Sequence, residues 1–432
     1  MKKMISLFAA LAAVLCVPAL GSAAADLSAV VCAPGTEISV EALPPLVVEG
    51  TNPPQGVAGA GIVADARAVR VFGGCNFPGK GPADGGKKVY YDAIWTLDLE
   101  NPVAWERAAE KLPCPAAYGA DGVGGENADG KLNVIFPPDG SGSFPVKIDN
   151  AAGTSRCFVA GGNVDGVPAN KAFVLQVNSF PRKPHEWKPL PDFPGAPRVQ
   201  PVAGMLRTPR GNAFALVGGF YFDKATKKAT LDRAGVIYYS SENKWELLPP
   251  LPENVSEAGL VGACAVEDGE GGMLIFGGVN AKIFKDALEN PAPDYLRREP
   301  AWYKFNADVL RLSFDADGNA KWEKLATVPA TARAGASAVR AGDGSIYFVC
   351  GELKPGFRSP ECVRIRIRTK ESERNEKPLD LLIFYAGTDQ QLRRIDQTSA
   401  RRPVRLRRLH AVGGACGRGR GGFFRPEERL PQ

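Results

Sequence analysis

The stretch MLIFGG, residues 273–278, is an apolar run that ends in a pair of glycines. The pattern recurs as VRVFGG (69–74), RCFVAGG (156–162) and FALVGG (214–219), and YFVCGE (347–352) is a degenerate fifth copy. A glycine pair lets the backbone turn sharply where side chains would collide. A short unit that recurs along the chain indicates a repeat architecture, in which each unit buries its faces against its neighbours.

A tryptophan followed by a proline-bearing turn marks a second point of each unit. These tryptophans are Trp105, Trp187, Trp245 and Trp322. We expect each of them to cover the seam between two neighbouring units, because one unit cannot bury both of its faces alone. The glycine pairs ending at 74 and 162 lie twice the usual distance apart, so a weaker unit containing KLNVIFPP (131–138) is expected between them. The count is then six units.

Short strands on a period of roughly 50 residues, with a Gly-Gly mark, are typical of kelch repeats. The sequence therefore predicts an all-β fold, a six-bladed kelch-type β-propeller over residues 37–368. The segment 37–50 resembles an outer strand that has no blade of its own. We expect it to complete the sixth blade beside CVRIRIR (362–368) and so to close the ring. Residues 279–305 form an insertion in the fifth blade, predicted to be partly helical and to lie over one face as a lid.

The two ends of the chain differ from the body. Residues 1–25 have two lysines, an apolar run and small residues before Ala25, which is the pattern of a secretory signal peptide. We therefore expect export to the periplasm, with cleavage near Ala25 and no later membrane span. From residue 367 onward 15 basic residues face eight acidic ones, whereas the whole chain carries only +6. We interpret residues 369–432 as a basic, disordered extension and expect no nucleic-acid partner.

Cysteine and histidine usage argues against a metal site. The nine cysteines include no C-x-x-C pair, and the only histidines are His185 and His410. We expect no metal and no other cofactor, and a copper oxidase is excluded because it needs clustered histidine ligands. An oxidising compartment would permit disulfides, but the sequence does not pair the cysteines. Cys157 and Cys350 lie in apolar strand patterns, where a cysteine is commonly a small buried residue.

The degenerate repeat carries the strongest candidate site residues. Glu352 directly follows its glycine, and Arg358 is six positions further along the same loop. In a propeller such loops gather at one mouth near the axis, so the corresponding polar residues of other blades are candidates as well. They are Asn76, Asn163, Asn280, Arg198 and Arg333. Guanidinium groups bind carboxylates, amides bind hydroxyls and a glutamate can move a proton, so this mouth suits a hydroxyl-rich anionic small molecule.

Each candidate also has a purely structural interpretation. A glutamate and an arginine six residues apart on a loop commonly form a surface salt bridge worth under about 1 kcal/mol. An asparagine after Gly-Gly often tolerates a left-handed turn. The arginines at the blade junctions can cap neighbouring backbone carbonyls. These alternatives stay open from the residues alone.

Several longer segments resemble the N-acetylneuraminate epimerase family. They are GVNAKIFKDALE, YKFNADVLRLSFD, FGGCNFPGKGPADGGKKVYYDAIWTLDL, PAAYGA and, most specifically, GELKPGFR with its G-E-x-K-P-G-x-R pattern. The resemblance covers roughly residues 40–366. The segments that come last in the usual family order come first here, which is similar to a cyclically permuted branch of the family. PAAYGA also lacks the arginine that usually precedes Ala-Tyr, and the second blade lacks its glycine pair.

The resemblance implies a mutarotase that interconverts the α and β anomers of N-acetylneuraminate by general acid/base ring opening and closure. It implies Glu352 as the proton acceptor and Arg358 as the residue that holds the substrate carboxylate, together with Arg198. The remaining expected substrate contacts are Lys354, Asn76 and Asn280. Two other functions stay open: an exported propeller that binds glycans without catalysis, and a kelch module that recruits a protein partner. The sequence does not indicate an oligomeric state.

Overall fold

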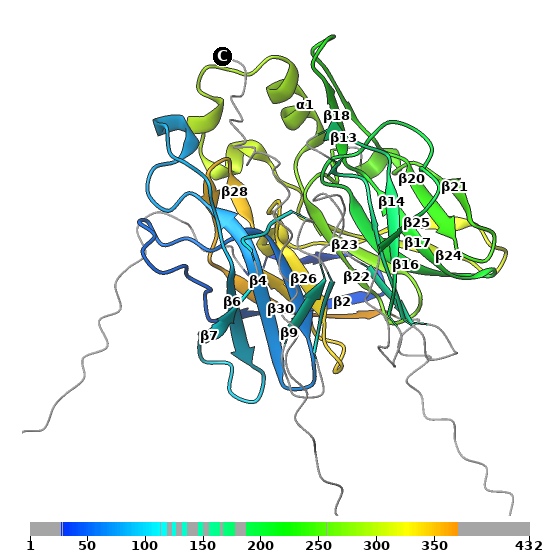
Figure 1. Ribbon diagram of the computed structural model, residues 1–432, viewed down its shortest axis with the longest axis horizontal. Helices are drawn as coiled ribbons and strands as arrows, with labels where there is room; N and C mark the ends of the chain where they lie inside the picture. Colours follow the sequence, from blue (N-terminus) through cyan, green and yellow to red (C-terminus); the bar gives the residue numbers. More distant parts are fainter. Residues whose placement is uncertain are drawn as a thin grey trace, which may run out of the picture. The chain divides into compact units, whose positions relative to one another are not determined.

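In the computed structural model of the protein, three of the four glycine pairs lie at the end of a strand, whereas the strand Ala68–Asn76 runs through Gly73 and Gly74 (Figure 1). The structure describes residues 27, 29–112, 114–118, 123–126, 132–135, 146–149, 155–164, 167–177, 187–255 and 257–369. The predicted signal peptide, most of the tail and parts of the second unit lie outside these residues. All described residues belong to the compact unit that spans residues 1–377.

Five antiparallel sheets of four main strands form the fold, and each runs through its strands in spatial order. The first contains β3 (Ala58–Ala64), β4 (Ala68–Asn76), β6 (Ala93–Asp98) and β7 (Trp105–Lys111), with β5 (Val89–Tyr90) beside β4. The next contains β10 (Val146–Asp149), β11 (Ser155–Ala160), β14 (Ala172–Val177) and β15 (Trp187–Pro189). Then come β16 (Val202–Thr208), β17 (Gly211–Val217), β20 (Gly235–Tyr239) and β21 (Lys244–Leu248).

The remaining two sheets both take a strand from the N-terminal region. One contains β22 (Ala263–Glu267), β23 (Met273–Gly277), β24 (Asp308–Phe314) and β25 (Ala320–Thr327), with β1 (Val31–Cys32) at its edge. The other contains β26 (Ser337–Arg340), β27 (Ile346–Val349), β30 (Cys362–Thr369) and β2 (Thr36–Leu43). Strand β2 pairs with β30 over its whole length, from Thr36 opposite Thr369 to Leu43 opposite Cys362.

The prediction of six blades is wrong for the described residues, which form five four-stranded blades. The segment expected to supply the weaker second unit contributes only the two-stranded sheet β8 (Val123–Glu126) and β9 (Leu132–Ile135). The apolar run of this unit, KLNVIFPP (131–138), is not followed by a glycine pair, so the mark of the other blades is missing at this point.

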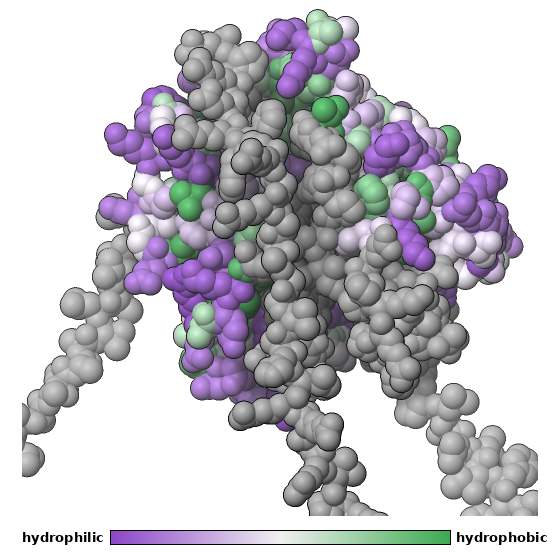
Figure 2. Space-filling model, in the orientation of Figure 1, coloured by the Kyte–Doolittle hydropathy of each residue, from purple (hydrophilic) through white to green (hydrophobic). Residues whose placement is uncertain are grey.

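The blades pack against one another as a propeller does. Along the series β10, β16, β22, β26, β3 and β8, each innermost strand lies beside the next. The apolar clusters fall between adjacent blades; one contains Leu206 of β16 together with Met273 of β23, both fully buried. In the view of Figure 2 the described surface is mostly hydrophilic, with scattered apolar patches. No helix in the described part of the chain is long and apolar enough to cross a membrane.

The tryptophans lie at the seams, as the sequence predicts. The indole Nε1 of Trp105 donates a hydrogen bond of 2.9 Å to the carbonyl of Pro44, in the turn that follows β2. Trp245 donates in the same way to Pro191 at 2.7 Å, and the corresponding acceptor for Trp322 is Pro249 at 3.1 Å. Each indole therefore joins the outer strand of one blade to the turn that leaves the outer strand of the preceding blade.

Short hairpins follow the second strand of three blades. They are β12 (Asn163–Val164) with β13 (Val167–Pro168), β18 (Phe220–Asp223) with β19 (Lys228–Leu231), and β28 (Glu352–Lys354) with β29 (Phe357–Arg358). In the blade built on β23 an insertion takes the hairpin's place. Its helix α1 (Ala281–Glu289) begins at Asn280, and the one-turn helices Tyr295–Arg297 and Pro300–Tyr303 follow. The expected helical insertion is thus present, and in Figure 1 α1 lies beside β18.

Candidate active site on the hairpin β28–β29

The hairpin β28–β29 brings Glu352 and Arg358 together. The two residues face each other in the strand register, and Nη1 of Arg358 lies 3.0 Å from Oε1 of Glu352. Only 3% of the arginine side chain is exposed, against 20% of the glutamate side chain. The pair is therefore a largely desolvated ion pair with one accessible carboxylate edge, which differs from the exposed salt bridge that the sequence left open.

Neighbouring groups hold Arg358 from several sides. Its guanidinium lies 5.3 Å from the ring centre of Phe77, and its backbone N–H donates to Oε1 of Gln55 at 3.2 Å. Nη2 lies 3.5 Å from the hydroxyl of Tyr118. Burial lowers the pKa of the guanidinium, but Glu352, Tyr118 and Cys75 together raise it by more, so the net pKa is raised and Arg358 stays a cation. Its buried Nε has no hydrogen-bond acceptor among the described residues.

The backbone on both sides fixes the position of Glu352. Its N–H donates to the carbonyl of Ala334 at 2.6 Å, and the N–H of Ala334 donates back at 3.0 Å. The N–H of Gly356, at the hairpin turn, donates to the carboxylate at 3.2 Å. With its main chain bridged to the neighbouring loop and one oxygen already bonded, the carboxylate is held in place before any ligand binds.

The insertion brings two tyrosines to the same carboxylate. Tyr295 and Tyr303 stack edge to face with ring centres 5.4 Å apart, and the hydroxyl of Tyr303 donates to the carbonyl of Tyr295. Burial raises the pKa of Tyr303 to about 12, and the negative charge of Glu352 adds to this. The pKa of Tyr295 is raised for the same two reasons. Both phenols are therefore neutral, and the one-turn helix Pro300–Tyr303 lies beside β28, the strand that carries Glu352.

Two contacts show that the insertion spans the hairpin as a lid. Nζ of Lys354, on β28, donates to the carbonyl of Arg298 at 3.3 Å. Beyond the hairpin, Arg297 forms an ion pair of 2.9 Å with Asp84, in the one-turn helix Pro82–Asp84 of the first blade. The segment that leaves β23 therefore reaches across the Glu352 hairpin to the next blade, in agreement with the prediction of a lid.

Tyr118 is a site residue that the residue-level reasoning missed. It adopts a left-handed backbone (φ 61°), which is unusual for a residue with a side chain, and it packs closely against Gly59. Burial and the nearby Cys75 thiol raise the pKa of its hydroxyl well above the usual value, so the phenol remains protonated. The only signal in the sequence was its place in PAAYGA.

The two asparagines expected at the mouth have other partners. Asn76 is fully buried; its amide donates to the carbonyl of Gly56 at 2.9 Å and accepts from the hydroxyl of Tyr91 at 2.6 Å. Asn280 caps the N-terminus of α1 by accepting from Ile283 at 3.1 Å, and it donates to Glu257 at 3.1 Å. Asn163 lies outside the residues whose side chains the structure describes.

The junction arginines cap backbone carbonyls, as the structural alternative proposed. Arg198 is 2% exposed; it donates to the carbonyls of Gly218 at 3.2 Å and Ala234 at 2.8 Å and pairs with Asp232 at 2.7 Å. Arg333 donates to the carbonyls of Ala330, Cys350 and Glu361. The structure therefore brings together Glu352, Arg358 and Lys354, and it gives Arg198 a separate set of partners.

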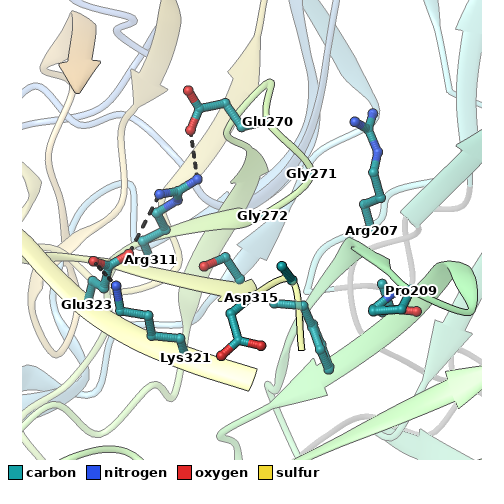
Figure 3. Close-up of a pocket in the computed structure, with 13 residues that line it drawn as sticks. Arg207, Pro209, Glu270, Gly271, Gly272, Arg311, Asp315, Lys321 and Glu323 are labelled. Atoms are coloured by element: carbon teal, nitrogen blue, oxygen red, sulfur yellow. Dashed lines mark hydrogen bonds and ion pairs between the residues drawn. The ribbon is translucent and has the colours of Figure 1, made fainter. Parts of the chain in front are cut away.

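The larger of two described cavities, about 370 Å³, lies elsewhere, among the turns that join β16 to β17, β22 to β23 and β24 to β25. Figure 3 shows Arg311 paired with Glu270 and Glu323, and Lys321 paired with Glu323, whereas no dashed line joins Arg207 or Asp315. Arg311 contacts Asp268 and Glu270 at 2.7 Å each and Glu323 at 3.6 Å. A smaller cavity of about 270 Å³ lies beside Asn280. We place the candidate site at Glu352 because proton-transfer groups converge there, whereas the larger cavity is lined by an internal ion-pair network.

Metal ligands do not gather in the described residues, where no group of three or more His, Cys, Asp or Glu side chains could hold an ion. The chemistry of the site is that of a carboxylate, a guanidinium and neutral phenols.

Comparison with known proteins shows the family to which this chain belongs. The family model for N-acetylneuraminate epimerase matches residues 144–391, which is more than half of the chain and includes the hairpin β28–β29. The chain belongs to the N-acetylneuraminate epimerase family. Within the family it is 32% identical over 190 residues to N-acetylneuraminate epimerase of Pasteurella multocida, covering 41% of this chain and 47% of the relative. It is 29% identical over 222 residues to that of Yersinia enterocolitica, covering 48% and 53%.

The chain spans about half the length of the curated relatives it matches. A solved structure of YjhT aligns with a TM-score of 0.38 and 24% identity, over 50% of this chain and 58% of that one. This likeness is distant, and the description of the fold rests on the strand pairing above.

Proposed function

We propose that this member of the N-acetylneuraminate epimerase family is a mutarotase that interconverts the α and β anomers of N-acetylneuraminate. The observation that carries the proposal is the pair on β28–β29, a positioned carboxylate with one accessible edge held by a buried guanidinium 3.0 Å away. The relatives' names supply the substrate, and the pair supplies groups with the right chemistry.

The proposed reaction needs only proton transfers. The carboxylate of Glu352 removes the proton of the anomeric hydroxyl, the bond between the anomeric carbon and the ring oxygen breaks, and the ring oxygen receives a proton from a solvent water molecule. The open keto form then rotates and closes by the reverse steps on the other face. No net oxidation occurs, and the proton that Glu352 accepts is returned when the ring closes.

We assign Arg358 two tasks in this scheme. Its Nη1 holds the carboxylate of Glu352 in place, and its unpaired Nε offers a donor to the acidic group of the substrate. A buried donor without an acceptor is unfavourable by about 1–3 kcal/mol, so an anionic ligand that satisfies it gains affinity. Lys354, on the hairpin beneath the lid, is the proposed further cationic contact.

For Asn76, Asn280 and Arg198 the structure favours positioning over direct substrate contact, because each is bonded within the protein. Asn76 supports the strand that leads to the site, and Asn280 starts the helix of the lid. Arg198 joins two blades on its own side of the fold.

Three further assignments belong to this proposal. Residues 1–25 act as a signal peptide, cleaved near Ala25, which exports the protein to the periplasm. The pairing of β2 with β30 supports ring closure by the N-terminal strand, with the two-stranded β8–β9 beside the five blades of the described residues. The extension expected over residues 369–432 begins after Thr369, which ends β30, and the reaction does not need it.

The test is the rate of anomer exchange in freshly dissolved N-acetylneuraminate, followed by NMR with and without the protein. A mutarotase accelerates the approach to the equilibrium anomer ratio at catalytic protein concentrations. Binding of the sugar without acceleration would instead identify a glycan-binding propeller and contradict the proposal. Repeating the assay with neutral hexoses tests whether the substrate needs an acidic group. Repeating it with residues 370–432 deleted tests whether the reaction needs the tail.

A further inference from the structure

Cys350 occupies a position that glycine holds in the sister blades. The first glycine of each pair has a left-handed backbone: Gly73 at φ 71°, Gly161 at 75°, Gly218 at 65° and Gly277 at 71°. Cys350, at the same point of its repeat, has φ 55°. Residues with a side chain rarely adopt this conformation, and such strain collects at functional positions. The chain therefore places a thiol where four equivalent positions carry no side chain.

The opposite loop makes room for this thiol. A β-carbon on Gly277 would lie 2.3 Å from the carbonyl oxygen of Arg333, and one on Gly73 would lie 2.5 Å from that of Ala116. Opposite Cys350 the facing residue is Gly56, where an added β-carbon would lie 2.5 Å from Sγ of Cys350. The cysteine thus fits because its neighbour has no side chain, and the two positions complement each other.

A second buried thiol lies directly beside it. Cys362 pairs with Val349 in the β27–β30 ladder, and the N–H of Cys350 donates to the carbonyl of Glu361 at 2.9 Å. A strand spacing of about 5 Å and a rise of about 3.4 Å per residue put the two cysteine α-carbons roughly 6 Å apart, within the range that a disulfide spans.

Both side chains also point into the same apolar cluster, which contains Leu46. The thiol of Cys350 lies 3.9 Å from the carbonyl oxygen of Leu46, and the thiol of Cys362 lies 3.5 Å from the carbonyl oxygen of Pro360. The N–H of Leu46 donates to that same Pro360 carbonyl at 2.8 Å, so both thiols lie at one short backbone junction.

The electrostatics favour thiol exchange at Cys362. Burial raises a thiol pKa, but the interaction with Cys350, a backbone hydrogen bond from Leu46 and the positive charge of Arg333 together outweigh it, so the pKa of Cys362 is lowered. Burial raises the pKa of Cys350. The thiolate is the nucleophile in disulfide exchange, so Cys362 is the better group for the first attack. Cys350 then attacks in the second step, on the mixed disulfide.

We propose that Cys350 and Cys362 form a redox pair that closes to a disulfide across the base of the hairpin carrying Glu352 and Arg358. The oxidant is a second disulfide, from a small thiol compound or a protein. The Cys362 thiolate attacks it and releases one thiolate; Cys350 then loses its proton, attacks the mixed disulfide and releases the second thiolate. Two cysteine thiols are oxidised and one external disulfide is reduced to two thiols. Because both thiols are buried, exchange occurs before the blade packs or when the hairpin opens.

The consequence is a covalent clamp on the candidate site. The link joins the residue two positions before Glu352 to the residue four positions after Arg358, so it closes a loop around the ion pair. Closing a loop restricts the unfolded and partly opened states more than the native state. The oxidised protein should therefore hold the hairpin more firmly than the reduced protein does.

Peptide mapping of the full-length protein tests the link. The purified, reduced protein is incubated with glutathione disulfide, denatured in N-ethylmaleimide and digested with trypsin, which cuts after Arg340, Arg358 and Arg364. Peptides 341–358 and 359–364 should be recovered joined, with a mass two hydrogen atoms below their sum. Recovery of both peptides carrying maleimide or glutathione, or of Cys350 joined to Cys264, would overturn the proposal.

Two variants separate the link from general effects on folding. Cys350→Gly restores the residue of the sister blades and should fold, and its Cys362 should then carry maleimide or glutathione. Cys264→Ala removes another buried thiol near Arg333 and should leave the joined peptides intact. In wild type the melting temperature should rise on oxidation by several degrees, and it should not change in Cys350→Gly. An equal rise in both proteins would contradict the clamp.

Discussion

The hairpins β18–β19 and β28–β29 start at equivalent points of two blades and have different tasks. Phe220 forms an isolated antiparallel bridge with Val199, as Glu352 does with Ala334. In each case the bridge partner directly follows a buried arginine, Arg198 or Arg333. The repeat therefore dictates the same backbone geometry at both places, and the difference lies in the residue at the bridge.

The surroundings of the two hairpins follow from that residue. Phe220 packs edge to face on Phe284 of α1, with ring centres 5.2 Å apart, so β18–β19 supports the start of the lid. Glu352 faces Arg358 and the coupled tyrosines, so β28–β29 carries charge beneath the far part of the lid. The same hairpin backbone therefore supports the lid in one blade and carries a candidate reactive group in another. The side chain at the bridge position determines which of the two roles a hairpin has.

The largest expected effect separates two buried arginines. Arg358→Met removes the partner of Glu352 and should lower the free energy of unfolding by about 3 kcal/mol. This is the lower end of the range for breaking a buried ion pair, because Glu352 is partly exposed. The substitution should also abolish accelerated anomer exchange. Denaturant unfolding and NMR exchange measure the two effects.

Arg198→Met is the matched control, since Arg198 is equally buried but joins Asp232 and two backbone carbonyls. We expect a similar loss of stability with exchange retained per folded molecule. Loss of exchange in folded Arg198→Met would show that the two arginines serve one site and would undo the comparison.

The next effect concerns the support of the lid. Phe284→Ala removes an aromatic contact that is partly buried, and it should cost about 2–3 kcal/mol, below the range for a fully buried phenylalanine. Because the helix then loses its packing on β18, KM for the sugar should rise more than kcat falls. A fall in kcat with unchanged KM would indicate that the insertion acts in the chemical step instead.

A smaller effect is expected at alkaline pH. Burial raises the pKa of Tyr303 to about 12, whereas in the unfolded chain it is close to the usual value of about 10. Between these values the unfolded state has lost its proton and the folded state has not, so stability falls as pH rises through this window. Tyr303→Phe should reduce that fall, as measured by thermal melts between pH 9 and 11, about one unit either side of the usual tyrosine pKa. An identical pH profile would show that Tyr303 is not the group that titrates.

The sequence predicted the parts of the fold that repeat. Three of the four glycine pairs lie at the ends of buried strands, and three of the four seam tryptophans donate to proline carbonyls of the preceding blade. The second unit was overcounted because KLNVIFPP has the apolar pattern of a strand but no glycine pair after it, and its described residues form a two-stranded sheet. The apolar pattern predicted a strand at these residues, but it could not predict which other strands would pair with that strand.

The candidate site was only partly predictable. Glu352 and Arg358 lie on one short hairpin, so their contact follows from local sequence. Tyr118, Tyr295 and Tyr303 come from distant segments, and their approach to the pair depends on blade order and on the path of the insertion. Asn76 and Arg198 were assigned by position alone, which does not reveal that neighbouring carbonyls occupy their donors.

The central claim is that the accessible carboxylate on β28–β29 moves the proton, and Glu352→Gln tests it most directly. The amide keeps the shape of the side chain but cannot accept the proton, so exchange measured by NMR should fall by about 10²–10⁴-fold while sugar binding persists. Glu361→Gln, in the segment that follows the hairpin, should retain wild-type exchange. Unchanged exchange in Glu352→Gln, with the protein folded and the sugar bound, would contradict the account.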